Sequence, residues 1–519
     1  MVEQRLVNAG LGGLSGEPVF RLLEGHVYVN TSLIQQVMRE VPSLLLTEGV
    51  LGLLPEELRG PLRANRRSLV DPRTLATALR LTWRERSWTP GARARLFDRE
   101  VQSIVAELGD FRVPDGLEAS EIATRFALLQ KRLGGYLDAV SWAMIYSYLS
   151  FHLFAHLSRS WAPSENALSL LGAGVSEIKT FRIHEMIANL AARVREDPDL
   201  SQAVLSTPPE DVLAEIRAGG LGAFGEDFAS LCRIHGHRLL SRDLAYPSWR
   251  ERPAAVLEMI QSLARGPAAV SERNIREVQA RLREELGEGL RGRSFQFLLR
   301  WCQEYYAIRE NMRYYADYFL FGMRALALAG AVDLKRRGIL YCTEDVFYLD
   351  AGEMDLGLRG GAGCEDLRET AALRRREYEQ YRKREPAEVR LERPGELLSG
   401  GGQSRGLERK APSRCFQAKS VGPGAVEGVL RVVRSAAELD EVRSGEIVVA
   451  KATDPAWTSY ISLASGLILE VGGLLSHGAI IARELGIPAV VDLSEATNLF
   501  RTGERVRLDG SAGTVERLS

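Results

Sequence analysis

A change of sequence pattern near residue 410 is the feature that most constrains the fold. Before residue 390, apolar residues recur at three- and four-residue spacings, as in "SFQFLLRWCQEYYAIRENMRYYADYFLFGMRALALAG", which predicts long helices. The segment "RPGELLSGGGQSRGLERKAPS" lacks this periodicity and is rich in Gly and Ser, which is typical of a linker. Beyond it, short apolar runs such as "GEIVVAKA" and "GLILEV" predict strands. The sequence therefore predicts an α+β multidomain protein, with a large, mostly α-helical domain over residues 1–394, a flexible linker over 395–413 and a small α/β domain over 414–519.

The composition indicates which kinds of binding partner and which cellular compartment to expect. The chain has 519 residues, a net charge of −1 and 26% charged residues of mixed sign, so there is no electrostatic case for nucleic-acid binding. The N-terminal sequence lacks the basic start and apolar core of a secretory signal. The five cysteines are scattered without a C-x-x-C pair, which favours a reducing compartment and argues against a disulfide framework or a zinc site. We therefore expect a cytoplasmic protein.

One uncharged stretch, Ala139–Leu157, is nearly long enough to span a bilayer. Its serines, histidines and tyrosines favour a buried central helix of the helical domain, so no membrane partner is predicted. His152 and His156 lie one helical turn apart in this stretch and resemble half of a metal site. Because no third ligand follows at a suitable spacing, core or pocket histidines are the favoured interpretation, and no metal site is predicted.

The segment "GGLLSHGAIIARELGIPAVV" predicts a short helix that begins beside a histidine. Ser476 is a suitable N-cap, while Gly486 and Pro488 are typical of a helix end. His477 is thereby placed in the first helical turn, where free N–H groups disfavour a cationic imidazole and would stabilise a phosphoryl group on it. Gly472 and Gly473 would let the backbone approach a phosphate closely. A surface or capping histidine is the alternative that this local pattern leaves open.

The surrounding sequence resembles the phosphohistidine swivelling domain of the phosphoenolpyruvate-utilising enzymes. The resemblance runs from Cys415 to Leu518 and includes "VGPGAVEGVLRVV", "TDPAW", "GGLLSHGAIIARELGIP" and "LDGSAGTV". It implies that His477 carries phosphate. We predict that Ser476, Gly472, Gly473 and Arg483 bind the substrate or the phosphoryl group.

Two motifs of the helical region contain candidate site residues. In "IRENMR", Arg309, Glu310 and Arg313 fall on one face of a long helix. The two arginines suit a phosphoryl group in transfer, and Glu310 could orient or deprotonate an acceptor hydroxyl. A network of structural salt bridges is the alternative. In "HGHRLLSRDL", a second polar cluster predicted to bind substrate or phosphate contains His237, Arg238 and Asp243.

These motifs, with "EGHVYVNTSLI" and "GILYCTEDVFYLDAGEM", resemble the helical substrate domain of rifampicin phosphotransferases, in order over residues 15–355. The resemblance implies that the "IRENMR" helix lines an acceptor pocket, with Arg309 and Glu310 as catalytic residues. In the full-length enzymes an ATP-grasp domain phosphorylates the histidine. The only early glycine-rich segment here, "AGLGGLSGEP", has no lysine after it and is not a phosphate-binding loop.

The predicted function is therefore that of a phosphotransferase component. We expect no cofactor in this chain, ATP and Mg²⁺ on a separate ATP-grasp subunit, and transfer from His477 to a hydroxyl or carboxylate of a small organic acceptor. Two alternatives remain: a phosphorylation-dependent ligase of the prodigiosin-ligase type, and a non-catalytic binding protein.

Overall fold

The computed structural model describes residues 20–23, 26–29, 90–109, 111–161, 178–239, 243–265, 284, 286–287, 289–381, 414–434, 436–453, 457–461, 463–472 and 476–518. Contacts divide the chain into two compact units. One contains residues 1–88, 111–135 and 322–413, and the other contains residues 89–110, 136–321 and 414–519. The predicted linker, 395–413, lies outside the described residues.

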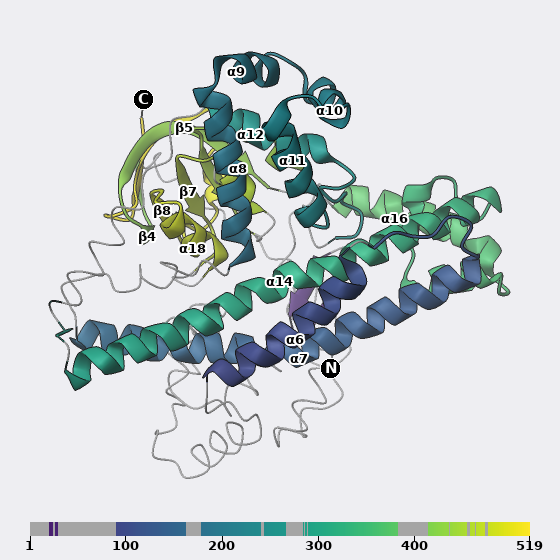
Figure 1. Cartoon of the computed structure of the whole chain (residues 1–519), viewed down its shortest axis with the longest axis horizontal. Coiled ribbons are helices and arrows are strands. Elements are labelled where there is room, and N and C mark those ends of the chain that lie inside the picture. The colour runs from purple at the N-terminus through teal and green to yellow at the C-terminus, as the bar shows by residue number, and fades with distance from the viewer. Residues whose placement is uncertain are drawn as a thin grey trace, which may run out of the picture. The chain divides into compact units, whose positions relative to one another are not determined.

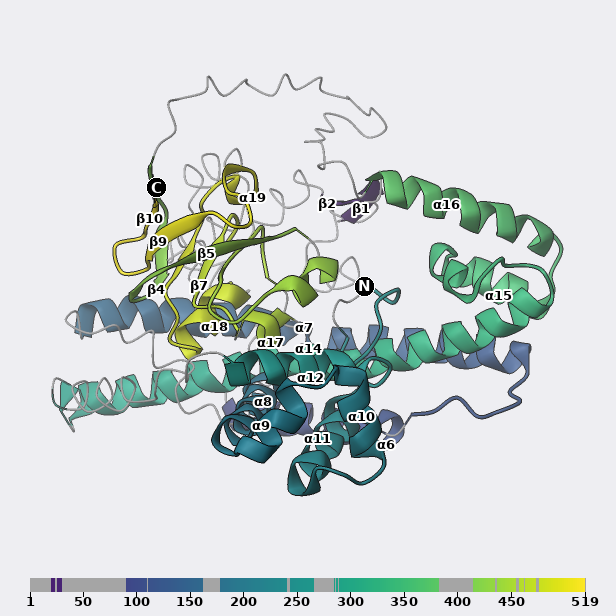
Figure 2. The same ribbon diagram turned by 90° about the horizontal axis from the view of Figure 1, so that it is seen from above.

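Two long helices, α7 (Ala119–Trp161) and α14 (Leu290–Arg336), run antiparallel and side by side (Figures 1 and 2). Their paired contacts run in opposite sequence order: Phe154 packs on Phe295, and the Tyr136 hydroxyl donates to the Met312 carbonyl at 2.9 Å. The uncharged stretch predicted to be a buried helix lies within α7, and its described side chains are buried. That prediction is confirmed, while the His152 and His156 side chains lie outside the described set.

The first unit contains the antiparallel pair β1 (Phe20–Leu23) and β2 (His26–Val29), the adjoining parts of α7 and α14, and a group of short helices. These helices are η3 (Thr343–Tyr348), α15 (Ala351–Arg359), η4 (Cys364–Asp366) and α16 (Leu367–Tyr381). A capping box between Asp350 and Glu353 starts α15, because each side chain accepts from the backbone N–H of the other at 2.8 Å. Arg374 then binds both oxygens of Glu353 at 2.6 and 2.9 Å, which fixes α16 against α15.

Other helices of the second unit precede α14 in sequence. They are α6 (Pro90–Leu108), α8 (Lys179–Glu196), α9 (Pro198–Leu205), α10 (Pro209–Arg217), α11 (Gly222–His235) and α12 (Pro253–Arg265). On α8 the buried residues Ile183, Ile187, Leu190 and Val194 recur at three- and four-residue spacings, as expected of an amphipathic helix. The helix begins against α14, where the Asn311 side chain accepts from the Lys179 backbone N–H at 2.9 Å.

The second unit also contains an eight-stranded mixed sheet in the order β3-β10-β9-β5-β6-β7-β8-β4. The strands are β3 (Cys415–Gln417), β4 (Lys419–Gly422), β5 (Ala425–Val433), β6 (Ile447–Ala450), β7 (Gly466–Leu469), β8 (Ala489–Val491), β9 (Arg505–Asp509) and β10 (Thr514–Arg517). Strands β5 to β8 pair in parallel and the others pair antiparallel. Every residue of β6, β7 and β8 is buried, as expected of parallel strands that are covered on both faces.

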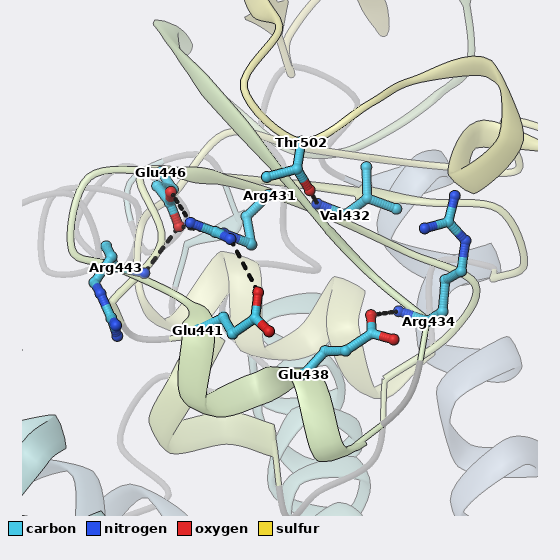
Figure 3. Close-up of polar contacts among 8 residues, drawn as sticks. All are labelled: Arg431, Val432, Arg434, Glu438, Glu441, Arg443, Glu446 and Thr502. Carbon is cyan, nitrogen blue, oxygen red and sulfur yellow. Dashed lines mark hydrogen bonds and ion pairs between the residues drawn. The ribbon is translucent and has the colours of Figure 1, made fainter.

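Short helices connect the strands: η5 (Ala436–Glu441), α17 (Thr458–Ile461), α18 (His477–Glu484) and α19 (Ala496–Leu499). An ion-pair cluster holds the β5–β6 connection (Figure 3). Arg431 binds both oxygens of Glu446 at 3.0 and 2.9 Å and Glu441 at 3.2 Å, while Glu446 also accepts from the Arg443 backbone N–H at 2.9 Å. This connection is therefore fixed by charge-assisted bonds as well as by the apolar core.

The predicted fold class is confirmed, because a mostly helical region precedes a small α/β region that contains the eight-stranded sheet. Among the described residues, no helix is long and apolar enough to cross a membrane. The described residues also contain no group of three or more His, Cys, Asp or Glu side chains placed to hold a metal ion.

Candidate phosphotransfer site

His477 is the first residue of α18, as the sequence predicts. The helix runs to Glu484, Gly486 follows with φ +65°, and β8 begins at Ala489. Glycine at Gly486 avoids the strain that a side chain meets in this left-handed conformation. The loop–helix–turn–strand prediction is therefore confirmed. The side chains of His477 and Arg483, and all of Gly473, lie outside the described set.

Ser476 caps the start of this helix, and Gly472 lies close beside it. The Ser476 hydroxyl accepts from the Ala479 backbone N–H at 3.4 Å, which is the N-cap geometry with a long bond. A Cβ on Gly472 would lie 2.9 Å from that hydroxyl oxygen and 3.3 Å from the Val491 Cβ. A side chain at Gly472 would therefore displace the Ser476 hydroxyl from the helix start.

In the helical region, Arg309 and Glu310 form a buried ion pair. The Arg309 Nε and Nη2 donate to Glu310 Oε1 at 3.2 and 2.9 Å, and the two residues are only 2% and 5% exposed. The Arg309 guanidinium also lies 5.5 Å from the centre of the Tyr306 ring. Arg313, one turn further along α14, is half-buried. The salt bridge considered from the sequence is thus present, and it places a cation and a carboxylate in a site from which water is excluded.

The second motif folds as a paired loop after α11. The Arg250 and Trp249 backbone N–H groups donate to the Gly236 and Arg238 carbonyls at 2.8 and 2.9 Å. Buried Arg238 forms an ion pair with Asp317 of α14 at 2.6 Å. Such a pair fixes the loop on the helix because either charge left alone in this position would be costly.

His235 and His237 pack on the same face of α14. The His235 Nδ1 lies 2.8 Å from the Tyr314 hydroxyl, and the His237 ring stacks on Tyr318 with centroids 3.5 Å apart. Burial, followed by the charges of Arg238 and Lys179, lowers the pKa of His235 to about 4. Burial also holds the pKa of His237 well below its ordinary value, with Arg238, His235 and Arg250 acting in the same direction. Both imidazoles are therefore neutral at physiological pH.

The two motifs meet on α14, although they are separated by about seventy residues of sequence. Glu310, Tyr314 and Tyr318 follow one another at four-residue intervals and so share a helix face. The loop packs on the last two of these, which lie one and two helical turns along α14 from Glu310. Asp243 instead lies at an exposed turn, where its side chain accepts from the Ala245 N–H at 2.9 Å.

Several residues of this cluster were missed from the sequence: His235, Tyr314, Asp317 and Tyr318. The tyrosine-rich continuation "YYADY", directly after "IRENMR", was the available signal, because it repeats the four-residue spacing of Glu310.

Comparison with known proteins finds a family match for each of these two regions. Residues 139–310 match the rifampicin phosphotransferase fourth domain, and residues 442–513 match the PEP-utilising enzyme mobile domain. A rifampicin phosphotransferase of Streptomyces sp is 31% identical over 375 residues, which cover 69% of this chain and 42% of that protein. The rifampicin phosphotransferase of Bacillus subtilis (strain 168) is 26% identical over 370 residues, with the same coverage.

A third relative is named for a different activity. The prodigiosin synthesizing transferase PigC of Serratia marcescens is 25% identical over 413 residues, covering 74% of this chain and 44% of that protein. The chain spans less than half the length of each of these relatives. The resemblance drawn from the motifs is confirmed: this chain contains a mobile domain of the PEP-utilising enzymes, preceded by a region that matches the fourth domain of rifampicin phosphotransferases.

Proposed function

We propose that this chain is a phosphotransferase component in which His477 carries a phosphoryl group to a small organic acceptor. The observation that carries the proposal is the position of His477 at the first residue of α18, within the region that matches the mobile domain. Free N–H groups at a helix start stabilise a phosphoryl group and disfavour a positive charge on the imidazole. A neutral imidazole is the nucleophilic form.

The reaction divides into two transfers. In the first, a phosphoryl group of ATP, which would be held with Mg²⁺ on a separate ATP-grasp subunit, forms a P–N bond to His477 as its bond to the rest of the nucleotide breaks. In the second, this P–N bond breaks and a P–O bond forms to a hydroxyl or carboxylate oxygen of the acceptor. A hydroxyl also loses its proton to a base, for which Glu310 is the candidate. Division through a covalent intermediate is ordinary nucleophilic catalysis.

The buried pair of α14 supports a role in the second transfer. A phosphoryl group that approaches Arg309 would compete for the guanidinium that Glu310 now binds. The carboxylate released in this way is then available to orient or deprotonate the acceptor. Arg313 is a second candidate cation, one turn away on the same helix.

The proposal is tested by labelling the histidine. The chain is incubated with ATP labelled in both its β- and γ-phosphoryl groups and with the isolated ATP-grasp domain of a rifampicin phosphotransferase. We expect acid-labile, alkali-stable label on this chain, no label in His477→Ala, and full label in the control His184→Asn. Label that persists in His477→Ala would assign the nucleophile to another residue.

A phosphorylation-dependent ligase is the second candidate, because similarity to the prodigiosin synthesizing transferase covers 74% of the chain. The products separate the two functions. A phosphotransferase releases a phosphorylated acceptor, whereas a ligase releases inorganic phosphate and a condensed product.

A further inference from the structure

The carboxyl ends of β6 and β7 bring Thr453 to the edge of the sheet where α18 begins. Ala450 is paired with Leu469 in the parallel register. The pairing continues beyond the strands, because the Glu470 and Val471 N–H groups donate to the carbonyls of Ala450 and Lys451 at 3.0 and 2.9 Å. Thr453 and Gly472, each three residues past its strand, therefore reach the same edge.

The Thr453 side chain approaches the first turn of α18. A Cβ on Gly478, the residue after His477, would lie 2.8 Å from the Thr453 Oγ1 and 2.5 Å from the Leu469 Cδ1. Both distances are shorter than a real Cβ contact. Gly478 is thus the reason that a hydroxyl from the β6 side can lie this close to the helix start.

The Thr453 hydroxyl makes no hydrogen bond within the described structure. Its oxygen is buried, and it is the one buried side-chain polar atom of the mobile domain for which the described structure offers no partner. Burial of an unpaired hydroxyl lowers stability. Next to it, the first N–H groups of α18 have no acceptor within the helix. The Thr453 hydroxyl and the first backbone N–H groups of α18 are therefore hydrogen-bond donors that lie close together beside Gly478, the residue after His477.

We propose that the Thr453 hydroxyl donates a hydrogen bond to a phosphoryl oxygen carried by His477. This inference rests on the proposed function and adds to it a phosphate-binding residue from the "TDPAW" motif. The hydroxyl keeps its proton, and only the hydrogen bond forms when the P–N bond forms. The bond favours the phosphorylated state because hydrogen bonds to charged groups are stronger than those between neutral groups.

The test needs neither the donor subunit nor the acceptor. The full chain is loaded with phosphoramidate, which transfers its phosphoryl group to imidazole and releases ammonia. Loading and decay of phosphohistidine at residue 477 are followed by ³¹P NMR. The signal of the His477→Gln variant, which arises from other residues, is subtracted. Thr453→Val should load more slowly or decay faster by about tenfold, the effect of one hydrogen bond to a charged group. Thr453→Ser should behave like the wild type.

A second threonine supplies the matched control. The Thr502 Oγ1 accepts from the Val432 backbone N–H at 3.0 Å (Figure 3). Thr502→Val should therefore lower the melting temperature without changing phosphohistidine lifetime, whereas Thr453→Val should keep or raise the melting temperature.

The outcomes separate the two proposals. Wild-type chain that is not phosphorylated at His477 overturns both the proposed function and this inference. Phosphorylation of His477 with equal rates in Thr453→Val and the wild type overturns the inference alone. So does a large drop in melting temperature in Thr453→Val, because the hydroxyl would then have a structural partner.

Discussion

At the scale of single residues, burial sets the chemistry of the helical cluster. His235 and His237 are neutral because their surroundings exclude water and because Arg238 lies beside them. Arg238 and Arg309 are buried as charges, and each has a carboxylate within hydrogen-bond distance. These ion pairs hold the arginine side chains in fixed orientations, as the proposed binding of an acceptor would require.

The low pKa of His235 predicts that the protein loses stability in mild acid. In the unfolded chain the imidazole titrates near pH 6.5, and in the folded chain its pKa is about 4. The stabilising contribution is therefore fully present above about pH 6.5 and is lost as the pH falls towards 4, because the unfolded state binds a proton first. Urea unfolding of the wild type and His235→Gln across this range should show a shallower pH dependence in the variant. Equal slopes would contradict the burial of a neutral His235.

At the scale of the elements, α14 is the common support of the cluster. Its four-residue spacing aligns Glu310, Tyr314 and Tyr318, and the loop after α11 packs against that face. The helix therefore connects the predicted transfer residues to a rigid surface of aromatic rings. The mobile domain uses the ends of β6 and β7 in the same way, to place a loop beside α18.

The role of Arg309 is tested by separating the two transfers. Arg309→Ala should leave phosphorylation of His477 intact and slow transfer to the acceptor by about 10³-fold or more, as expected for an arginine on a transferring phosphoryl group. Arg300→Ala, an exposed arginine of the same helix, is the matched control. Rates of both transfers and the melting temperature are measured in each variant. An early-melting Arg309→Ala that is also poorly phosphorylated would show that the ion pair only holds the helices together.

Two Gly→Ala changes should act in opposite directions. A Cβ on Gly510 would lie 2.0 Å from the Gly422 carbonyl oxygen and 2.7 Å from the Ala489 backbone nitrogen. Because backbone cannot move aside cheaply, Gly510→Ala should destabilise the mobile domain by about 1–3 kcal/mol. Gly135 of α7 meets no atom within 4 Å, so Gly135→Ala should stabilise by about 0.5–1 kcal/mol through helix propensity. Denaturant unfolding of both variants checks the signs, and a neutral Gly510→Ala would contradict the close approach of these strands.

At the scale of the whole molecule, the proposed chemistry requires two sites that act in turn. One is the start of α18 and the other is the cluster on α14. The linker predicted over 395–413 would allow a carrier domain to visit both, and tethering would keep its local concentration high. Since the linker lies outside the described residues, this movement stays a prediction.

The whole chain by itself should not bind ATP tightly. The sequence contains no glycine-rich phosphate loop followed by lysine, and ATP is proposed to bind the separate ATP-grasp subunit. Isothermal calorimetry of the purified chain with Mg²⁺-ATP should show no tight binding. Micromolar affinity in this experiment would contradict the assignment of ATP to a second subunit.

Features that depend on neighbours along the chain could be predicted from the linear order of the residues. The spacing of apolar residues predicted α7, α14 and the buried strands, and Ser476, Gly486 and Pro488 placed the ends of α18 around His477. Capping, turn formation and helical periodicity act over a few residues, so their signals are present in the linear order.

The contacts between side chains that are distant in sequence could not be predicted in this way and are known from the fold. It paired Arg238 with Asp317, placed His235 on Tyr314, and brought the Thr453 hydroxyl to Gly478. Asp243, grouped with Arg238 from the sequence, lies instead at an exposed turn. These contacts depend on helix packing and on strand register, which join residues remote in sequence. The burial that sets the pKa of each histidine arises from the same packing and has no local sequence signal.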